Sequence, residues 1–425
     1  MDSSGREAPR DFFDVVRSGD EAARQGRIDE ALEIYDLAAE LGPGHGLPFT
    51  RKAIVQFRAA FGAPRAPRQA ARDRAAVSMS VLGGYGQFGN QLLQYAFLRL
   101  YATAHGLEAQ APDWIGRDLF DLVDPLPEKP LPMLDEAAAD LFASLRREST
   151  AVHSGADLKG YFCTDMRRWG DVRDAWRALF APSPKLRPLI ERAVAALRRR
   201  GSTLVAVHVR RRDFGYGRYW IAPEAWYLDW LRDRWRTLER PVLYVASDDA
   251  QARERFAEFS PACAADLDVE MPGAGFFLDH SILREADVLA IANSSFSFTA
   301  SLLNSSAAEF VRPDPASRRL VPFEPWSSPV LVDAPLRPHA REAILALLRP
   351  QDRVLYVGEY CSDWANAARA AHPQLRIRET DLEATLDELW SRGEFDALDH
   401  LVIGAECDAA RVLQGARESL DFGRI

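Results

Sequence analysis

The stretch that decides the fold is Leu204-Val205-Ala206-Val207-His208-Val209-Arg210-Arg211-Arg212-Asp213. Four aliphatic residues bounded by polar ones are typical of a strand buried in an α/β sheet. An open α/β sheet binds ligands at the carboxyl ends of its strands, where this stretch places His208, Arg210, Arg211 and Asp213. Arginine is always charged and binds paired oxygens through two N–H groups, so an anionic ligand such as phosphate is predicted. The alternative is a strand end that enters an exposed arginine loop.

The composition excludes several classes of protein. A chain of 425 residues, 47% hydrophobic and 27% charged, predicts a globular protein of two to four domains. With 53 basic and 62 acidic residues the net charge is −9, which argues against a nucleic-acid or anionic-membrane partner. The four cysteines form no CxxC pair, so we expect no zinc site and no disulfide framework. No apolar run is long enough for a membrane span and no signal-peptide core is present, so we expect a cytoplasmic protein.

The amino-terminal part, residues 1–63, has a helical pattern. Small residues at the predicted helix crossing, followed by Gly42-Pro43, resemble one tetratricopeptide unit, and a plain helical hairpin is the alternative. One such unit cannot bury its own face, so we expect it to pack on the next helix, a protein partner or a second copy of the chain. Residues 64–76, with two prolines, are predicted to form a linker.

A second informative stretch joins a predicted strand, Val77–Leu82, to a helix predicted from Leu92 to about His105. The glycine-rich turn between them ends in three candidate site residues, Gly89, Asn90 and Gln91. Glycine lets the backbone approach a ligand and a helix start presents amides, so this pattern predicts a pocket for an anion or a substrate. It is not a P-loop, because no Gly-Lys-Ser/Thr ends it, and a tight strand-to-helix connection is the alternative.

Another strand, Pro241–Ser247, is predicted to deliver two carboxylates, Asp248 and Asp249. They are candidates to bind a ribose or a metal. The alternative is that they cap the following helix, Ala250–Phe259, which is the simpler role for Asp248. Tyr219 and Trp220 lie in an aromatic loop before a helix predicted to start near Pro223. Such side chains stack on a sugar or a base, or else pack in the core.

The third informative stretch begins with Phe276–Asp279, followed by a short predicted helix, His280–Ala286, and an apolar strand, Val288–Ala292. The polar turn after this strand leads into a helix through Leu303. Its hydroxyls and amides suit phosphate, and the candidate residues are Asn293, Ser294, Ser295, Phe296 and Ser297. Helix capping by Ser294 or Ser295 is the alternative, and both roles can coexist.

These three stretches, together with Ser247-Asp248-Asp249 and Asp279, resemble in the same order the motifs of the metal-independent fucosyltransferases. The glycine turn is most similar to that of the bacterial α1,2-fucosyltransferases. The resemblance covers about residues 77–332 and implies a GT-B fold, an α/β pair of Rossmann-type lobes. The acceptor lobe would be residues 77–185 and the donor lobe residues 186–335. Arg212 and Phe298-Thr299 depart from the family pattern.

The resemblance implies GDP-fucose as the donor substrate and no metal or other cofactor. Arg210 would hold the diphosphate and stabilise the leaving GDP, with support from Arg211. Asp213 would position or deprotonate the acceptor hydroxyl, and Asn90 would reach the fucose or the acceptor as the cleft closes.

Other donor contacts implied by the resemblance come from the arginine motif itself and from the carboxyl-terminal motifs. His208 and Asp279 would contact the nucleoside, and Ser294 and Ser295 would bind phosphate. Asp248, Asn293, Phe296 and Ser297 would complete the donor site. Gly89, Gln91, Tyr219 and Trp220 are assigned to the acceptor side of the cleft.

The carboxyl-terminal part, residues 336–425, resembles the opening of a methyltransferase Rossmann domain with a degraded glycine turn, Gly358-Glu359-Tyr360-Cys361. We expect no independent methyl transfer from it.

The resemblance to the fucosyltransferases implies an inverting enzyme that transfers fucose to a sugar hydroxyl of a glycan, glycoprotein or surface polysaccharide in α1,2 linkage. The alternatives are a protein O-fucosyltransferase and a non-catalytic nucleotide-binding tetratricopeptide adaptor.

Overall fold

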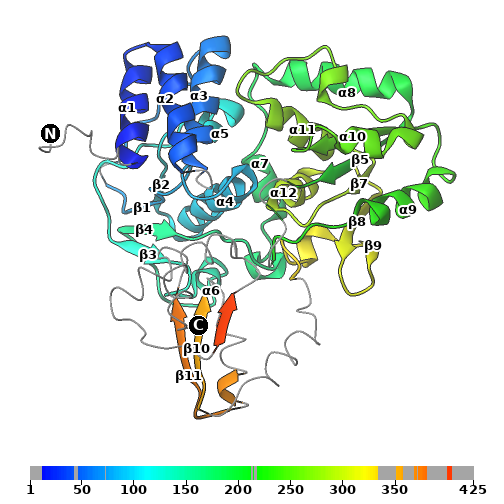
Figure 1. Ribbon diagram of the computed structural model, residues 1–425. Coiled ribbons are helices and arrows are strands. Elements are labelled where there is room, and N and C mark those ends of the chain that lie inside the picture. Colours follow the sequence, from blue (N-terminus) through cyan, green and yellow to red (C-terminus); the bar gives the residue numbers. More distant parts are fainter. Residues whose placement is uncertain are drawn as a thin grey trace, which may run out of the picture. The chain divides into compact units, whose positions relative to one another are not determined.

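The computed structural model describes residues 12–42, 46–71, 73–211, 214, 218–333, 351–357, 368–370, 372–380 and 400–403 (Figure 1). The chain forms two compact units. The first comprises Met1–Asp213, Pro223–Pro313 and Arg319–Leu331, and the second Phe214–Ala222, Asp314–Arg318 and Val332–Ile425. In the described part of the chain, no helix has the length and apolar character needed to cross a membrane.

Three helices open the first unit: α1 (Phe12–Arg24), α2 (Ile28–Leu41) and α3 (Leu47–Phe61) (Figure 1). The first two cross closely at Gly19, where an added Cβ would lie 2.6 Å from the Tyr35 ring. The Tyr35 hydroxyl donates to Asp20 at 2.7 Å. The predicted helical pattern is therefore confirmed, and the tetratricopeptide assignment remains a prediction.

Helix α3 is fastened to the rest of the first unit by charged and backbone contacts. Arg58 pairs with Asp113 at 2.6 Å and with Asp118 at 2.8 Å. Lys185 donates to the carbonyl of Phe61, the last residue of the helix, at 2.9 Å. Gly273 has φ +72°, and an added Cβ would lie 2.2 Å from a carbonyl oxygen of α3. Helix α3 thus contacts α5 (Ile115–Phe120) and the loop before it, and also the loop before α11 (Gly275–Arg284).

The first sheet has the strand order β2-β1-β4-β3, and all its pairs are parallel. Its strands are β1 (Ala76–Ser78), β2 (Glu108–Gln110), β3 (Met133–Asp135) and β4 (Ala156–Lys159). The strand predicted over Val77–Leu82 ends early, because Asp157 accepts hydrogen bonds from the Ser78 hydroxyl at 2.6 Å and from the Ser80 N–H at 2.8 Å, and the chain turns there.

Helix α4 (Phe88–His105) follows β1 and begins four residues earlier than predicted. Most of its first three turns is buried, including Leu92, Tyr95 and Phe97. Shorter helices complete this part of the unit: α5 (Ile115–Phe120), α6 (Leu141–Leu145), η1 (Met166–Trp169) and α7 (Arg173–Ala178).

The second sheet has the strand order β6-β5-β7-β8-β9. Its strands are β5 (Thr203–Val209), β6 (Pro241–Ser247), β7 (Val288–Ala290), β8 (Glu309–Asp314) and β9 (Arg319–Pro322). The pairs β5–β6, β5–β7 and β7–β8 are parallel, which confirms the buried strand at 204–207 and those that end before Asp248 and Asn293.

The helices around this sheet agree with the sequence pattern at two places and differ at two. Their bounds are α8 (Arg187–Arg200), α9 (Glu224–Trp235), α10 (Ala252–Arg255), η2 (Ala257–Phe259), η3 (Ala264–Asp266), α11 (Gly275–Arg284), α12 (Ser295–Leu303) and η4 (Pro325–Ser327). The helix predicted near Pro223 and the one predicted to run through Leu303 are confirmed. Phe276–Asp279 belongs to α11 because Phe277, His280 and Ser281 share one buried helical face. The helix predicted over Ala250–Phe259 breaks into α10 and η2.

Both sheets have a point at which the strand order reverses. From β5 the chain passes to β6 on one side, and β7 then takes the other side of β5. In the first sheet β1 lies between β2 and β4. Ligands of open α/β sheets bind in the crevice at such a point, outside the carboxyl ends of the strands.

The second unit contains a three-stranded parallel sheet of order β11-β10-β12. Its strands are β10 (Arg353–Val357), β11 (Arg376–Thr380) and β12 (His400–Ile403). The degraded glycine turn at 358–361 lies outside the described residues, and the methyltransferase resemblance remains a prediction.

Candidate functional site

The candidate site lies where β5 and β7 end. Val207 pairs with Ala290 in the parallel register, so the third residue after each, Arg210 and Asn293, leaves the sheet at the same edge. On the other side of β5, Val209 pairs with Ser247, which places Asp248 beside Arg210. The register therefore brings together three of the predicted site segments.

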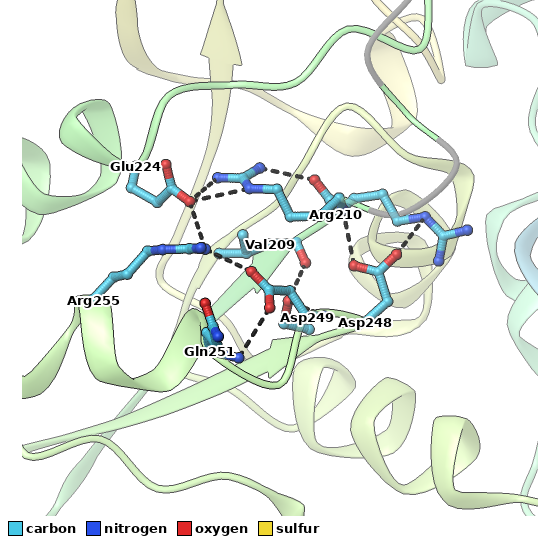
Figure 2. Close-up of polar contacts among 9 residues, drawn as sticks. Val209, Arg210, Glu224, Asp248, Asp249, Gln251 and Arg255 are labelled. Atoms are coloured by element: carbon cyan, nitrogen blue, oxygen red, sulfur yellow. Dashed lines mark hydrogen bonds and ion pairs between the residues drawn. The ribbon is translucent and has the colours of Figure 1, made fainter.

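Arg210 is held from two directions. Its Nε lies 3.2 Å from Oδ2 of Asp248, as Figure 2 shows. Its Nη2 donates to Oε1 of Gln87 at 2.9 Å. Gln87 is the N-cap residue of α4, so the guanidinium lies between the end of β5 and the start of α4. Both partners hold the planar group in a fixed orientation.

Arg211 points into a different network. Its Nη2 lies 2.6 Å from Oε1 of Glu224, and Arg255 binds the same oxygen at 3.0 Å and Oδ2 of Asp249 at 2.6 Å (Figure 2). The Gln251 N–H and the Arg255 guanidinium lower the pKa of Asp249. This network joins the end of β5 to the start of α9 and to α10, and Nη1 of Arg211 also donates to the Arg210 carbonyl at 2.8 Å.

Asp248 does not cap the following helix, so the capping alternative is wrong for this residue. Its Oδ1 accepts the backbone N–H of Arg211 at 2.9 Å, while Oδ2 pairs with Arg210. The parallel pairing of β5 with β6 places Asp248 opposite these arginines. Asp249 is the residue whose side chain accepts an N–H of the next turn, that of Gln251, at 2.9 Å.

His208 is buried beneath this edge, with 3% of its surface exposed. Its Nδ1 lies 2.8 Å from Oγ of Ser297, and its ring centroid lies 5.1 Å from that of Phe296. Burial, with help from Arg210, lowers the pKa of His208 to about 3, so the imidazole is neutral at physiological pH. A neutral ring ties α12 to β5 and leaves Arg210 as the positive group beside it.

The start of α12 has the cap expected from its sequence. Ser294 is the N-cap residue, and its Oγ accepts the N–H of Phe296 at 3.3 Å, which confirms the capping alternative for this serine. Asn293 and Ser294 are both buried. Ser297 holds the turn closed, because its Oγ accepts the N–H of Ala292 at 3.2 Å.

The starts of α4 and α12 touch, although Gly89 and Ser295 are 206 positions apart in the sequence. An added Cβ at Gly89 would lie 2.4 Å from the carbonyl carbon of Ser295 and 2.5 Å from the nitrogen of Phe296. Only a residue without a side chain fits at this distance. Gly89 thus lies against the turn after β7, and α4 and α12 are neighbours in Figure 1.

Replacing Gly89 with alanine is expected to destabilise the fold by about 2 kcal/mol and to disturb the site, because the new methyl group meets backbone rather than a flexible side chain. Chemical denaturation measures the loss. Gly275→Ala is the matched control, since its added Cβ meets nothing within 4 Å at the first residue of α11. Equal stability of Gly89→Ala and wild type would show that the two helix starts are not packed as described.

Asn90 and Gln91 have different positions in the first turn of α4. Gln91 is 1% exposed, and its Nε2 donates to the Gly86 carbonyl at 3.1 Å, so it holds the glycine turn. Asn90 is half-buried and lies against Gly86, where an added Cβ would be 2.7 Å from Asn90 Nδ2. Of the two, Asn90 has the more exposed side chain.

Asp279 faces β6. Its Oδ1 accepts the Tyr244 hydroxyl at 2.5 Å. Burial raises the pKa of Asp279 to about 6, against the opposing effect of the Tyr244 hydrogen bond. Its predicted contact with the nucleoside remains a prediction.

Asp279→Asn is expected to raise the free energy of unfolding above about pH 6 by roughly 1 to 3 kcal/mol. The folded pKa of about 6 exceeds the ordinary value of 3.8, so the folded state binds the extra proton and wild-type stability falls as the pH rises through this window. The gain should vanish below about pH 4, where both states carry the proton. Denaturant titrations from pH 4 to 8 measure it, and a difference that does not depend on pH would contradict it.

Three of the predicted site residues, Asp213, Tyr219 and Trp220, remain predictions. Asp213 lies outside the described residues. Tyr219 and Trp220 belong to the second unit, where Tyr219 packs on Phe214 and Trp220 donates to the Val332 carbonyl at 2.9 Å. Across the described ranges, no group of three or more His, Cys, Asp or Glu side chains is arranged to hold a metal ion.

Sequence reasoning missed two residues that organise the site, Gln87 and Glu224. Gln87 lies inside the glycine-rich turn, but nothing in the pattern distinguishes it from its neighbours as the partner of Arg210. Glu224 looks like an ordinary acidic residue in a first helical turn, a common position for a carboxylate. Their partners lie on other elements and are visible only in the fold.

The chain matches no protein-family model and no curated protein. Among solved structures it is similar to NodZ α-1,6-fucosyltransferase soaked with GDP-fucose, with 16% identity and a TM-score of 0.41 over 59% of this chain and 99% of that one. It is also similar to the fucosyltransferase NodZ from Bradyrhizobium, with 16% identity, a TM-score of 0.40 and the same two coverages.

Proposed function

We propose that this protein is a glycosyltransferase that moves fucose from GDP-fucose to a sugar hydroxyl, on a GT-B-like pair of lobes. The observation that carries the proposal is the position of Arg210, which lies at the strand-order reversal of the second sheet and bonds the N-cap residue of α4. The order of the motifs in the sequence supports the same function. The α1,2 linkage and a glycan or surface polysaccharide as acceptor belong to this proposal.

In the proposed reaction an acceptor oxygen attacks the anomeric carbon of fucose while the bond from that carbon to the diphosphate oxygen breaks, with inversion. The bonding electrons pass to GDP, and Arg210 stabilises the charge that develops on its β-phosphate. Asp248 fixes the guanidinium, so the favourable interaction needs little reorganisation during the reaction. Asp213 takes the acceptor proton, and Asn90 orients the fucose or the acceptor.

The rest of the proposed donor site surrounds this centre. In this proposal a phosphate binds beside Ser294 and Ser295, through the N–H groups at the start of α12 other than that of Phe296, which Ser294 caps. His208, Asp279, Asn293, Phe296 and Ser297 shape the pocket for the nucleoside. No step of the proposal uses a metal ion.

A protein partner or self-association through the amino-terminal helices is part of the proposal as well. Phe13, Leu41 and Phe49 expose 50%, 47% and 59% of their surfaces on α1, α2 and α3. Large apolar side chains exposed on neighbouring helices favour a contact with another protein surface. The same observation favours the alternative of a nucleotide-binding adaptor without transfer activity.

The test is an assay of GDP release from GDP-fucose with EDTA present, with simple galactosides or a serine- and threonine-containing peptide as acceptor. We expect acceptor-dependent GDP release with galactosides, and NMR of the product gives the linkage. Transfer to the peptide alone would favour protein O-fucosylation. GDP binding without any turnover would favour the adaptor.

A further inference from the structure

Two tyrosines form a stacked pair at the carboxyl edge of the first sheet. The ring centroids of Tyr85 and Tyr161 are 4.2 Å apart, and the ring planes differ by 20°. Tyr85 lies in the glycine turn after β1, and Tyr161 follows β4, the neighbour of β1 in the sheet. Both side chains are half-buried. The pair therefore lies at the strand-order reversal of the first sheet.

The surrounding residues hold this pair in place. Gln94, fully buried in α4, donates to the carbonyls of Tyr85 and Gly160, each at 3.0 Å, and so ties the two loops together. Gly86 has φ +77°, and an added Cβ would lie 2.9 Å from the Tyr161 ring. Neither the turn nor the loop can shift without disturbing the stack.

The pair also lies close to the candidate site. Tyr85 is two residues before Gln87, which accepts from Arg210, and two residues of extended chain span at most about 7 Å. Asn90 and Tyr161 both lie against Gly86, and Gly89, the residue before Asn90, lies against the start of α12. Lys159 Nζ lies 5.9 Å from the centre of the Tyr85 ring and adds a cation to this edge.

We propose that Tyr85 and Tyr161 form the acceptor subsite, which binds one ring of a saccharide acceptor by stacking and reaches its hydroxyls through Asn90 and Lys159. The inference rests on the proposed function and adds the residues that hold its carbohydrate acceptor. A sugar ring has an apolar C–H face and a polar rim, so it fits aromatic carbon flanked by an amide and an ammonium group. A peptide has no such face to present to the pair.

Saturation-transfer NMR tests the proposal with methyl β-D-galactoside, methyl N-acetyl-β-D-glucosaminide and a serine-containing peptide as probes. We expect at least one of the two sugars to bind the wild type and the peptide not to bind. Tyr85→Leu and Tyr161→Leu should each weaken that binding by about tenfold or more, and Tyr85→Phe and Tyr161→Phe by less than about threefold, because stacking needs the ring and not the hydroxyl. Melting temperatures verify that each variant is folded.

Phe259→Leu is the matched control, since Phe259 is a half-buried ring 5.0 Å from Trp235 on α9 and is expected to leave sugar binding unchanged. Unchanged sugar binding in both leucine variants, equal loss in the phenylalanine and leucine variants, or binding of the peptide alone would overturn the proposal. GDP titrations of the same samples separate the outcomes. If GDP binds and neither sugar does, only the acceptor subsite is wrong, whereas absent GDP binding removes the proposed function itself.

Discussion

Replacing Arg210 with alanine is expected to weaken GDP binding by about 2 kcal/mol or more, roughly 30-fold, and to lower kcat by about 100-fold. The guanidinium is fixed by Asp248 and Gln87 at the end of β5, so its charge is already aligned with the proposed diphosphate. A charged hydrogen-bond donor contributes most where negative charge develops, which is why kcat should fall along with affinity. Isothermal titration calorimetry measures the binding, and GDP release measures kcat.

Two further variants test whether the loss of GDP affinity comes from the charge and the shape of the Arg210 side chain. Arg210→Lys retains the charge but loses the forked geometry, so we expect an intermediate affinity. Arg232→Ala is the matched control in the same part of the unit, because Arg232 pairs with Asp229 and Glu258 on the surface. If Arg210→Ala and Arg232→Ala bind GDP equally well, Arg210 does not contact the nucleotide.

Replacing Arg58 with alanine is expected to lower the free energy of unfolding by about 3 to 5 kcal/mol. Asp118 has a fully buried side chain and pairs with this guanidinium at 2.8 Å, so the substitution leaves a buried carboxylate without its cation. Arg58 also pairs with Asp113 and thereby links α3 to the loop between β2 and α5. Urea denaturation measures the loss.

A control and a double variant distinguish this mechanism from a general effect on the helix. Lys52→Ala on the same helix removes an exposed pair with Asp36 and is expected to cost less than about 1 kcal/mol. Adding Asp118→Asn to Arg58→Ala removes the stranded charge, so part of the lost stability should return. Additive losses in the double variant would contradict the role assigned to Asp118.

The strands and helices with purely local signals were predictable from the sequence. β5 is a short apolar run, and α8 carries one apolar helical face, so each has its pattern within its own residues. The start of α4 was not predictable in this way. Glycine ordinarily argues against a helix interior, and Gly89 lies in the first turn only because the backbone of Ser295 and Phe296 is packed against it.

The candidate site shows the same division. The arginines at the end of β5 and the polar turn after β7 could be found as motifs, because a strand followed by charged residues is a local pattern. The different tasks of Arg210 and Arg211 depend on Asp248 and Glu224, which are brought to them by strand register and by the start of α9. No spacing in the sequence encodes these partners.

The proposed function requires a metal-independent GDP site at the carboxyl ends of β5 and β7. Its most direct test is a calorimetric titration of the wild-type protein with GDP, GDP-fucose and UDP in the presence of EDTA. We predict saturable binding of GDP and GDP-fucose at one site and no binding of UDP. Absence of GDP binding, or binding that returns only when a divalent cation is added, would contradict the account.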